Sequence, residues 1–474
     1  MKILLINTNR NKSPMPVVPL GACLVAEAAE RAGHRVRLLD LMLERRPAAA
    51  LRRELAERPP DVVGLSVRNI DNNDMQAPVF FLRELAPLID AVRGATAAPI
   101  VIGGAAAGVM PEALLRFTGV EWCVTGDGET VFPALLGRLA QGGSARDLPG
   151  VAFLENGAYV ANPAAPAGAF RCRPPDLRRW LDTRGYRSRL ATTPLQTKLG
   201  CHFSCVYCTY RKIEGSAYRL GDPEEAAEAV RKLAADGLRH VEFVDNVFNS
   251  PREHALAICG HLARRPHGAS LQSLELNPLF VDDELFAALE SAGFAGVGIT
   301  VESAADPVLE GLRKGFTAGH VRRAAEVVAR HRLPCVWIFM LGGPNETRET
   351  VEETLRFAER HVRPSDVAFF GTGIRVYPGT GLEAIARGQG VLGAAPGEML
   401  EPVFYTSPEV DAAWLQERVR GAVRGAMRYM GADSLGFRYL PQLHRAGYAL
   451  GLRPPLWRHT ARIRRGLRAV GMDV

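Results

Sequence analysis

The first 145 residues alternate short apolar runs with longer amphipathic stretches. The apolar runs occupy residues 3–6, 36–39, 62–67, 100–102 and 122–124. Amphipathic stretches with helical spacing, such as 20–32 and 79–92, lie between them. Because alternating strands and helices favour a parallel sheet with helices on both faces, we expect an α/β, Rossmann-like domain over residues 1–145.

Polar or glycine-rich residues follow the apolar runs of this domain. Parallel sheets of this kind bind ligands beyond the carboxyl ends of their strands. The candidate ligand-binding residues there are Thr8, Asn9, Arg68, Asn69, Gly103, Gly104, Gly126 and Glu129. A plain nucleotide-binding Rossmann domain is one interpretation, but no G-x-G-x-x-G motif follows the first run, which disfavours a dinucleotide.

Residues 146–193 are predicted to form a linker. Within it, residues 151–160 form two apolar runs separated by Glu155-Asn156-Gly157, a pattern typical of a β-hairpin. A stretch rich in proline and alanine follows at 162–168.

Six further strand–helix units are predicted over residues 194–392. Their strands fall at residues 195–199, 241–244, 271–276, 297–301, 335–341 and 367–376. Helix starts are marked by Asp222-Pro223-Glu224 and by a capping box that pairs Ser250 with Glu253. Six parallel units over this length predict a partial, six-stranded TIM-like barrel, with its active site at the carboxyl ends of the strands.

Residues 393–474 are predicted to be a helical C-terminal region. Near its end, Leu456, Thr460, Ile463, Leu467 and Val470 share one helical face, and arginines occupy the rest. A basic amphipathic helix of this kind lies either on a membrane surface or, more often, against its own domain.

The overall composition is that of an ordinary globular protein, with 47% hydrophobic and 23% charged residues. The net charge of +7 rests on arginine, since only six of the 58 basic residues are lysine. Such a bias, together with abundant Ala, Gly and Pro, is typical of a GC-rich genome. Basic and aromatic residues do not interleave as they do in a nucleic-acid stacking platform, so we expect no nucleic-acid partner.

Three features predict a cytoplasmic protein. Residues 1–7 turn polar too soon for a signal peptide, and no run of 18 apolar residues occurs. Five of the eight cysteines are scattered through apolar stretches, which fits a reducing compartment. These five are Cys23, Cys123, Cys172, Cys259 and Cys335.

The other three cysteines, Cys201, Cys205 and Cys208, form a C-x3-C-x2-C motif directly after the first predicted barrel strand. Three thiolates this close bind three corners of a cubic iron–sulfur cluster and leave the fourth iron open to chemistry. Zinc is the alternative, but it normally takes four ligands as two paired knuckles, and no second C-x2-C occurs.

This cysteine spacing, with Tyr207 just before the last cysteine, resembles the radical S-adenosylmethionine (SAM) superfamily. The resemblance implies that the open iron binds SAM and that an electron from the cluster cleaves it to a 5′-deoxyadenosyl radical. It also implies SAM contacts at the strand ends of the barrel: Asp245 near the amino group, Glu302 and Ser303 at the ribose, and Gly343 at the adenine.

The same resemblance implies that Tyr207 contacts adenine through its backbone. Arg375 begins an R-x-Y-P-G-T sequence that resembles the sixth-strand motif of the cobalamin-type members. Lys314 either places a cation near the SAM carboxylate or is a solvated loop charge.

The order of motifs in the first domain resembles the cobalamin-binding domain that precedes the barrel in class B radical SAM proteins. Many cobalamin domains carry D-x-H-x-x-G, whose histidine ligates cobalt, whereas residues 7–12 here contain no histidine. The resemblance therefore implies cobalamin with an unligated or water-bound lower face. Arg68 or Asn69 lies beneath the corrin in one interpretation and only caps the sheet edge in the other.

Together these resemblances imply a cobalamin-dependent radical SAM enzyme, and we expect a methyltransferase acting on an unactivated carbon of a lipid, peptide or natural product. An unactivated C–H bond offers no lone pair to an electrophilic methyl group, so a radical must remove the hydrogen first. The alternatives are a cyclase or rearrangement enzyme with the same cofactors, and a cobalamin-binding sensor with a structural cluster. The substrate and the catalytic residues are unidentified, and flavodoxin or ferredoxin is the expected type of electron donor.

Overall fold

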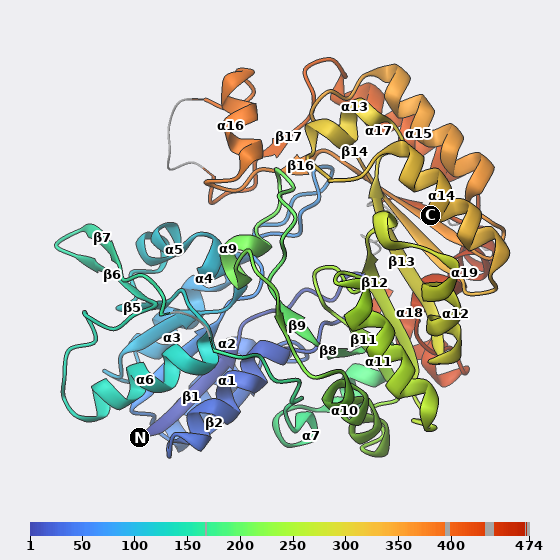
Figure 1. Ribbon diagram of the computed structural model, residues 1–474. Helices are drawn as coiled ribbons and strands as arrows, with labels where there is room; N and C mark the ends of the chain where they lie inside the picture. The colour runs from blue at the N-terminus through green and yellow to red at the C-terminus, as the bar shows by residue number, and fades with distance from the viewer. Residues whose placement is uncertain (166–167, 394–398, 432–439, 470, 472–474) are drawn as a thin grey trace.

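The computed structural model describes residues 1–165, 168–393, 399–431, 440–469 and 471. Within these residues the chain forms two seven-stranded sheets, two short two-stranded sheets and the helices that cover them. Figure 1 shows the first large sheet, blue to teal, at the lower left, and the second, green to orange, curving around the right-hand side. The predicted α/β architecture is confirmed.

The first sheet has the strand order β2-β1-β3-β4-β5-β6-β7. Its strands are β1 (Lys2–Asn7), β2 (Arg35–Asp40), β3 (Val62–Ser66), β4 (Ile100–Gly103), β5 (Trp122–Val124), β6 (Val151–Glu155) and β7 (Ala158–Ala161). Strands β1 to β5 are parallel and coincide with the five predicted runs. Because helices cover both faces, β1 is apolar at consecutive positions, and residues 3–6 are each at most 4% exposed.

The helices of the first domain are α1 (Leu20–Arg31), α2 (Pro47–Glu57), η1 (Phe81–Glu84), α3 (Ala86–Arg93), α4 (Ala105–Val109), α5 (Pro111–Thr118) and α6 (Gly128–Ala140). Helices α1 and α6 pack together on one face, over a cluster that contains Ile3 and Phe132. Helices α2 and α3 pack together on the opposite face, over Leu4 and Leu88. The alternation of Ile3 and Leu4 between the two clusters follows the period-two geometry of a strand.

The predicted hairpin is confirmed, but it belongs to the first sheet. Strand β6 pairs antiparallel with β5, and β7 with β6, so the sheet continues beyond residue 145. Two short helices, α7 (Leu177–Trp180) and α8 (Thr183–Arg187), then lead toward the second sheet. The boundary at residue 145 and the linker over 146–193 remain predictions.

The second sheet is the expected partial barrel, with the order β18-β15-β14-β13-β12-β11-β8 and parallel pairing throughout. Its strands are β8 (Thr193–Leu195), β11 (His240–Phe243), β12 (Ser270–Leu276), β13 (Phe294–Glu302), β14 (Cys335–Leu341), β15 (Val367–Thr372) and β18 (Tyr429–Gly431). The seventh strand, β18, comes from the region that the sequence predicted as helical.

The first and last predicted barrel strands each divide in two. After β8 the chain leaves the barrel as β9 (Lys198–Leu199), which pairs antiparallel with β10 (Arg219–Leu220). After β15 it continues as β16 (Ile374–Arg375), which pairs antiparallel with β17 (Phe404–Tyr405). Both excursions carry the chain toward the first domain, where the candidate site lies.

The helices of the second half are α9 (Tyr210–Glu214), α10 (Pro223–Ala235), α11 (Arg252–Arg264), η2 (Pro278–Phe280), α12 (Asp283–Ser291), α13 (Asp306–Gly311), α14 (Ala318–Arg330), α15 (Arg348–His361), α16 (Gly381–Gly388), α17 (Ala412–Gly425), α18 (Leu440–Ala449), η4 (Leu456–His459) and α19 (Thr460–Ala469). The predicted cap of α10 is confirmed, since the Asp222 carboxylate accepts from the Glu224 and Glu225 amides. The capping box at Ser250 is wrong: Pro251 is the N-cap of α11, and the Ser250 hydroxyl accepts from the Tyr218 hydroxyl instead.

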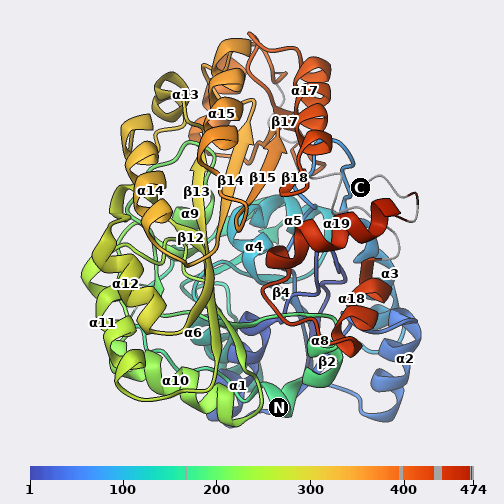
Figure 2. The ribbon, with the colours of Figure 1, turned by 90° about the vertical axis from the view of Figure 1, so that its right-hand side faces the viewer.

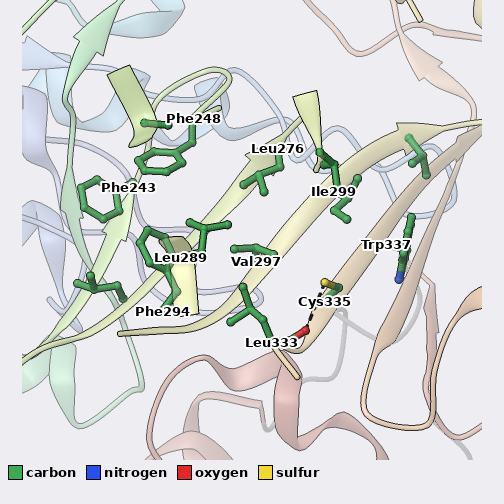
Figure 3. Close-up of a cluster of buried hydrophobic side chains, with 14 of the residues drawn as sticks. Phe243, Phe248, Leu276, Leu289, Phe294, Val297, Ile299, Leu333, Cys335 and Trp337 are labelled. Atoms are coloured by element: carbon green, nitrogen blue, oxygen red, sulfur yellow. Dashed lines mark hydrogen bonds between the residues drawn. The ribbon is translucent and has the colours of Figure 1, made fainter. Parts of the chain in front are cut away.

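A single apolar core fills the layer between the barrel strands and their helices. Figure 3 shows Phe243, Phe248 and Phe294 meeting beside Val297 and Ile299 in this layer. The rings of Phe243 and Phe294 stack with centroids 5.6 Å apart. These outward-facing side chains fix the strands, and with them the positions of the strand ends.

The C-terminal helix α19 packs against its own domain. Arg464, 4% exposed, donates hydrogen bonds to backbone carbonyls of Val423, Ala426 and Tyr429 at the end of α17 and the start of β18. Figure 2 shows α17 and α19 beside β18. Of the two alternatives for the C-terminal helix, the structure therefore supports packing against its own domain. Val470, which was predicted to share its apolar face, lies outside the described residues. Among the described residues no helix is long and apolar enough to cross a membrane.

Candidate functional site

The loop that carries Cys201, Cys205 and Cys208 runs between β9 and α9. All three cysteines are free thiols. Backbone hydrogen bonds hold the loop: the Cys201 amide donates to Gly215, and the Val206 amide donates to Leu312. Gly200 precedes the loop with φ +86°, and a Cβ there would lie 2.1 Å from the Ala217 carbonyl oxygen, so only glycine fits this turn.

Burial shapes the chemistry of the three thiols. It raises the pKa of Cys208 to about 11 and that of Cys201 and Cys205 above their usual value, while the charge of Lys314 opposes the shift at all three. Among the residues that the structure describes, no three His, Cys, Asp or Glu side chains are grouped so as to hold a single metal ion. Three thiols on one loop beside a buried cation fit an iron–sulfur cluster with one open iron.

Beside this loop, the buried Glu302 and Lys314 form a polar network with the partly buried Tyr207. The Tyr207 hydroxyl donates to Glu302 Oε1 at 2.6 Å, and Lys314 Nζ donates to the same oxygen at 2.8 Å and to the Tyr207 hydroxyl at 3.0 Å. Glu302 ends β13 with φ 55°, next to a register shift between β13 and β14. A left-handed glutamate is rare, and such strain clusters at functional sites.

One oxygen of this network is unused. Glu302 Oε2 is buried and has no hydrogen-bond partner in the described structure. Burial lowers the pKa of Lys314, but the neighbouring Glu302 and Tyr207 raise it by more. The pKa of Lys314 therefore lies well above its usual value. A carboxyl group with a free acceptor oxygen fits a hydroxyl donor such as the ribose of SAM. The solvated alternative for Lys314 is wrong, since this residue is 6% exposed.

The side-chain role of Tyr207 was missed by the sequence analysis, which assigned it only a backbone contact. Its hydroxyl bridges residues 95 and 107 positions away in the chain. No local pattern could have signalled this.

Asp245 is fully buried at the end of β11 and is held by the chain itself. Its Oδ1 accepts from the amides of Thr197 (2.7 Å) and Lys198 (3.2 Å), and its Oδ2 accepts from the Thr197 hydroxyl at 2.6 Å. These bonds fasten β9, and with it the cysteine loop, to the barrel. The contact with the SAM amino group stays a prediction.

Glu214 fastens the other end of the cysteine loop and was also missed. Its carboxylate accepts from the Gly200 backbone amide at 3.0 Å, from Gln196 Nε2 at 3.0 Å and from Asn246 Nδ2 at 2.6 Å. Burial raises the pKa of Glu214, and the three donors oppose that shift. The loop is thus clamped to the ends of β8 and β11 at both sides.

Ser303 and Gly343 lie at the ends of β13 and β14 as predicted, and their present contacts are structural. The Ser303 hydroxyl is 3.1 Å from that of Thr354 and accepts from the Ala305 amide. Gly343 packs on Leu312, and the preceding Gly342 amide donates to the buried Glu346. The ribose and adenine contacts of Ser303 and Gly343 stay predictions.

Arg375 lies at the join between the two domains. Its Nε donates to Asp71 Oδ2 at 2.8 Å, and its other nitrogens donate to backbone carbonyls of Val376 and Met399. Nearby, the Tyr377 hydroxyl donates to Asn73 at 2.8 Å. The segment after β3 therefore reaches the sixth-strand loop of the barrel, as the blue trace beside β16 shows in Figure 1. A cofactor contact of Arg375 stays a prediction.

A cavity of about 1540 Å³ lies between the carboxyl edge of the first sheet and the beginning of the barrel. Five predicted ligand-binding residues line it together: Arg68, Gly103, Gly104, Gly126 and Glu129. An ordinary small-ligand pocket measures roughly 300–1,000 Å³, so this cavity suits a much larger molecule. Its size and its position at the strand ends fit a corrin.

An ion pair between Arg219 and Asp127, which the sequence analysis missed, closes part of the cavity. Arg219 of β10 donates to both carboxylate oxygens of Asp127, at 2.7 and 3.1 Å, and thereby joins the barrel to the loop after β5. Gly104, φ +94°, lies in the cavity wall, where a Cβ would be 2.5 Å from the Val67 carbonyl oxygen. Among the described residues that line the cavity, no histidine occurs.

Thr8, Asn9 and Asn69 are not part of this wall. They line a separate, small cavity of about 20 Å³, which shares only Arg68 with the large one. The Thr8 hydroxyl donates to the Ser66 carbonyl at 3.0 Å, and Asn9 accepts from the Asn11 amide at 3.1 Å. These contacts shape the loop after β1, and a direct contact of the three residues with cobalamin stays a prediction.

Comparison with known proteins assigns both halves of the chain. The radical SAM superfamily model matches residues 196–358, and the B12 binding domain model matches residues 6–136. The structure of the radical SAM methyltransferase TsrM from Kitasatospora setae, with cobalamin and a 4Fe–4S cluster bound, is 25% identical with a TM-score of 0.84 and covers 99% of both chains. The zinc alternative for the three cysteines is therefore wrong.

Two methylases resemble the chain in sequence. Tryptophan 2-C-methyltransferase of Streptomyces laurentii is 26% identical over 439 residues, which cover 79% of this chain and 73% of the relative. Hopanoid C-3 methylase of Methylococcus capsulatus is 28% identical over 349 residues, which cover 70% of this chain and 62% of the relative.

Proposed function

Because the chain belongs to the cobalamin-binding radical SAM enzymes, we propose that it transfers a methyl group from SAM to an unactivated carbon of its substrate. When bound, the 4Fe–4S cluster supplies an electron, SAM supplies a radical and a methyl group, and cobalamin carries that methyl group. The observation that carries the proposal is the joint presence of the cysteine loop and the large cavity, which meet at α9 and β10.

The chain's own residues prepare two sites that face one another. Cys201, Cys205 and Cys208 would hold the cluster. Glu302 would accept a SAM ribose hydroxyl through its free Oε2, while Tyr207 and Lys314 keep its other oxygen in place. Since Glu302 and Lys314 are buried, Tyr207 is partly buried and the three side chains hold one another by hydrogen bonds, the network reaches the bound state with little reorganisation.

The corrin would lie in the cavity between the first sheet and the barrel. Arg68, Gly103, Gly104, Gly126 and Glu129 are the candidate contacts on the first-domain side. The ion pair of Arg219 with Asp127 would help to keep water out of the space between the two cofactors. We also propose that the boundary between the two domains lies after the hairpin of β6 and β7 rather than at residue 145, because both strands extend the first sheet.

Methyl transfer is favoured over the two alternatives. Two relatives similar over most of this chain are named as C-methylases, which supports methyl transfer over cyclisation or rearrangement. A sensor with a structural cluster has no need for a buried acid with a free acceptor beside its cysteines. The network around Glu302 therefore supports an enzyme.

The test is product analysis with the anaerobically reconstituted holoenzyme, hydroxocobalamin, SAM and a reductant, on candidate lipid, peptide and small-metabolite pools. We expect 5′-deoxyadenosine and S-adenosylhomocysteine in roughly equal amounts, because one SAM generates the radical and another provides the methyl group. A labelled SAM methyl group should appear in product. If 5′-deoxyadenosine forms without label in any product, cyclisation or rearrangement replaces methyl transfer.

We further propose a cytoplasmic enzyme reduced by flavodoxin or ferredoxin. All eight cysteines are free thiols in the structure, which supports a reducing compartment. A nucleic-acid partner is not part of the proposal. Reduction of the cluster by purified flavodoxin, followed spectroscopically, tests the proposed electron donor.

A further inference from the structure

Side chains on the inner face of the barrel are partly exposed, whereas those on its outer face are buried. Side chains alternate along each strand, so neighbouring residues face opposite sides. On β14, Trp337 and Phe339 face the helices and are at most 1% exposed, while Ile338 and Met340 are partly exposed. The same alternation occurs on β15, where Phe369 is partly exposed between two buried neighbours. The barrel therefore has an accessible interior.

One wall of this interior is apolar. Its buried base consists of Val336, Val367 and Trp457. Trp457 belongs to η4 in the C-terminal region. Above this base pack the partly exposed side chains of Leu274, Ile338, Phe369 and Met430. This wall offers apolar surface from β12, β14, β15 and β18 to a bound molecule.

The adjoining wall, from β11 and the first half of β12, is rich in hydrogen-bond acceptors. Glu242 accepts from the Thr192 hydroxyl and from Gln272 Nε2, the latter at 2.8 Å. Gln272 is 3% exposed, and its Oε1 has no partner in the described structure. A buried amide oxygen without a donor costs free energy, so a donor supplied by a ligand would stabilise this site.

Glu275 adds a second free acceptor to the same wall. Simple alternation would place it opposite its neighbour Leu274, but β12 has a register shift between Ser273 and Leu276, and both residues are partly exposed. The carboxyl group of Glu275 makes no hydrogen bond or ion pair with the described residues. Burial raises its pKa to about 8, the charges of Glu302 and Glu242 act in the same direction, and Lys314 opposes them. Lys314 is already bound to Glu302, so it does not neutralise Glu275.

The titratable groups around Glu275 come from four elements: Glu242 on β11, Glu302 on β13, Lys314 after α13 and the neutral Tyr210 on α9. A further cation near this wall is Arg68, whose charge lowers the pKa of Glu242 and whose NH1 donates to Asn69 Oδ1. Acceptors thus outnumber cations on this wall. Such a wall favours a ligand that brings its own positive charge.

Resting on the proposed function, we propose that the methyl acceptor is an amphipathic amine, bound inside the barrel with its ammonium group on Glu275. The ammonium donates to the wall formed by Glu242, Gln272 and Glu275, and the apolar body of the molecule lies against Ile338 and Phe369. Phosphate- or carboxylate-bearing substrates would meet like charge here. A neutral hydrocarbon would leave the acceptors unsatisfied.

The binding reaction also has a proton balance. At pH 7 a carboxyl group with a pKa near 8 is largely protonated, and it must release that proton to the buffer before it pairs with an ammonium ion. The ammonium keeps its own protons. Binding of an amine should therefore release close to one proton per site at pH 7, and binding of a neutral analogue should release none.

The test is anaerobic titration calorimetry of the SAM-loaded holoenzyme with three isosteric probes: 2-naphthylmethylamine, 2-naphthylmethanol and 2-naphthoate. We expect the amine to bind at least roughly tenfold more tightly than the alcohol, and the carboxylate not to bind. In Glu275→Gln this amine preference should fall to about twofold or less while the affinity for the alcohol stays the same. Glu353→Gln, an exposed glutamate on α15, is the matched control and should behave as wild type.

Equal affinities for amine and alcohol in the wild type would overturn the proposal, as would an amine preference that survives in Glu275→Gln. Repeating the titration in buffers of different ionisation enthalpy measures the proton release, which should vanish in Glu275→Gln. The affinity for SAM is measured on the same variant. A loss of SAM binding with an unchanged amine preference would assign Glu275 to SAM and overturn the proposal.

These outcomes are separable from those that test methyl transfer. If labelled methyl reaches a neutral or anionic substrate, methyl transfer holds and the amine proposal fails. If no methyl label reaches any product although amines bind selectively through Glu275, the amine site holds and methyl transfer fails.

Discussion

Arg375 and Asp71 form a buried ion pair between two segments 304 residues apart in the chain. Nε of the arginine lies 2.8 Å from Oδ2 of the aspartate, and the two side chains are 3% and 0% exposed. The pair joins the segment after β3 of the first sheet to β16 of the barrel. Because the large cavity lies between the same two domains, this contact helps to fix the distance between its walls.

Replacing one residue of this ion pair should therefore destabilise the folded protein. We expect Arg375→Met to lower the free energy of unfolding by about 3–5 kcal/mol, because it leaves the buried Asp71 carboxylate without a cation, held among the described residues only by the Asn73 amide. Urea denaturation of the anaerobic holoenzyme measures the change. Arg116→Met is the matched control: its exposed pair with Glu112 should contribute at most about 1 kcal/mol. A loss at Arg375 no larger than at Arg116 would contradict the structural role of the pair.

The three cysteines of the loop should be the only protein ligands of the cluster. Replacing Cys201, Cys205 and Cys208 together by alanine should abolish the brown colour and SAM cleavage, because the other five cysteines lie in other segments. The reconstituted wild type should carry about four irons per site. Cys259→Ala, in the buried layer of α11, is the control and should retain a full complement of iron. A full cluster in the triple variant would disprove the assignment.

Glu302 should serve both uses of SAM at one site. Glu302→Gln is expected to weaken SAM binding roughly tenfold and to lower 5′-deoxyadenosine and S-adenosylhomocysteine together. Tyr207→Phe keeps the carboxylate and Lys314 but removes one hydrogen bond, so its loss should be smaller, about 1 kcal/mol. Equilibrium dialysis with SAM gives both affinities. A fall in only one of the two products would show that SAM is used at two different sites.

Cobalamin should bind without an imidazole ligand. Residues 7–12 contain no histidine, and none occurs among the described residues that line the cavity. The electron paramagnetic resonance spectrum of bound cob(II)alamin should therefore lack the nitrogen superhyperfine splitting of an imidazole-ligated cobalt. Observed splitting of that kind, or a failure of cobalamin to bind, would refute this interpretation of the cavity.

The raised pKa of Glu275 predicts a pH dependence of stability. The folded protein holds a proton on Glu275 up to about pH 8, whereas the unfolded chain releases it near the ordinary value of 4.5. Between these values the folded state binds more protons, so this group makes stability fall as the pH rises. Glu275→Gln should flatten the decline in the urea midpoint between pH 6 and pH 8.5. Parallel curves for variant and wild type would show that Glu275 is already ionised at pH 6.

Local patterns in the sequence predicted much of this protein. The C-x3-C-x2-C spacing places three thiols on one loop in any fold, and the apolar runs mark the strands because buried parallel strands are apolar at consecutive positions. Parallel strands end at the same edge of a sheet, so the sequence could predict which residues line a ligand site there. These residues are Arg68, Gly103, Gly104, Gly126 and Glu129. The family resemblance supplied the cofactors that these positions would bind.

The tertiary structure decided the contacts between residues far apart in the chain. Three such contacts depend on where separate loops meet. Tyr207 and Lys314 share Glu302, Arg375 pairs with Asp71, and Arg219 pairs with Asp127. The seventh strand β18 is only three residues long, too short for a pattern, and pairing with β15 fixes it. Sequence spacing sets which side chains share one face of an element, whereas burial, free acceptors and charge balance arise only when whole elements pack together.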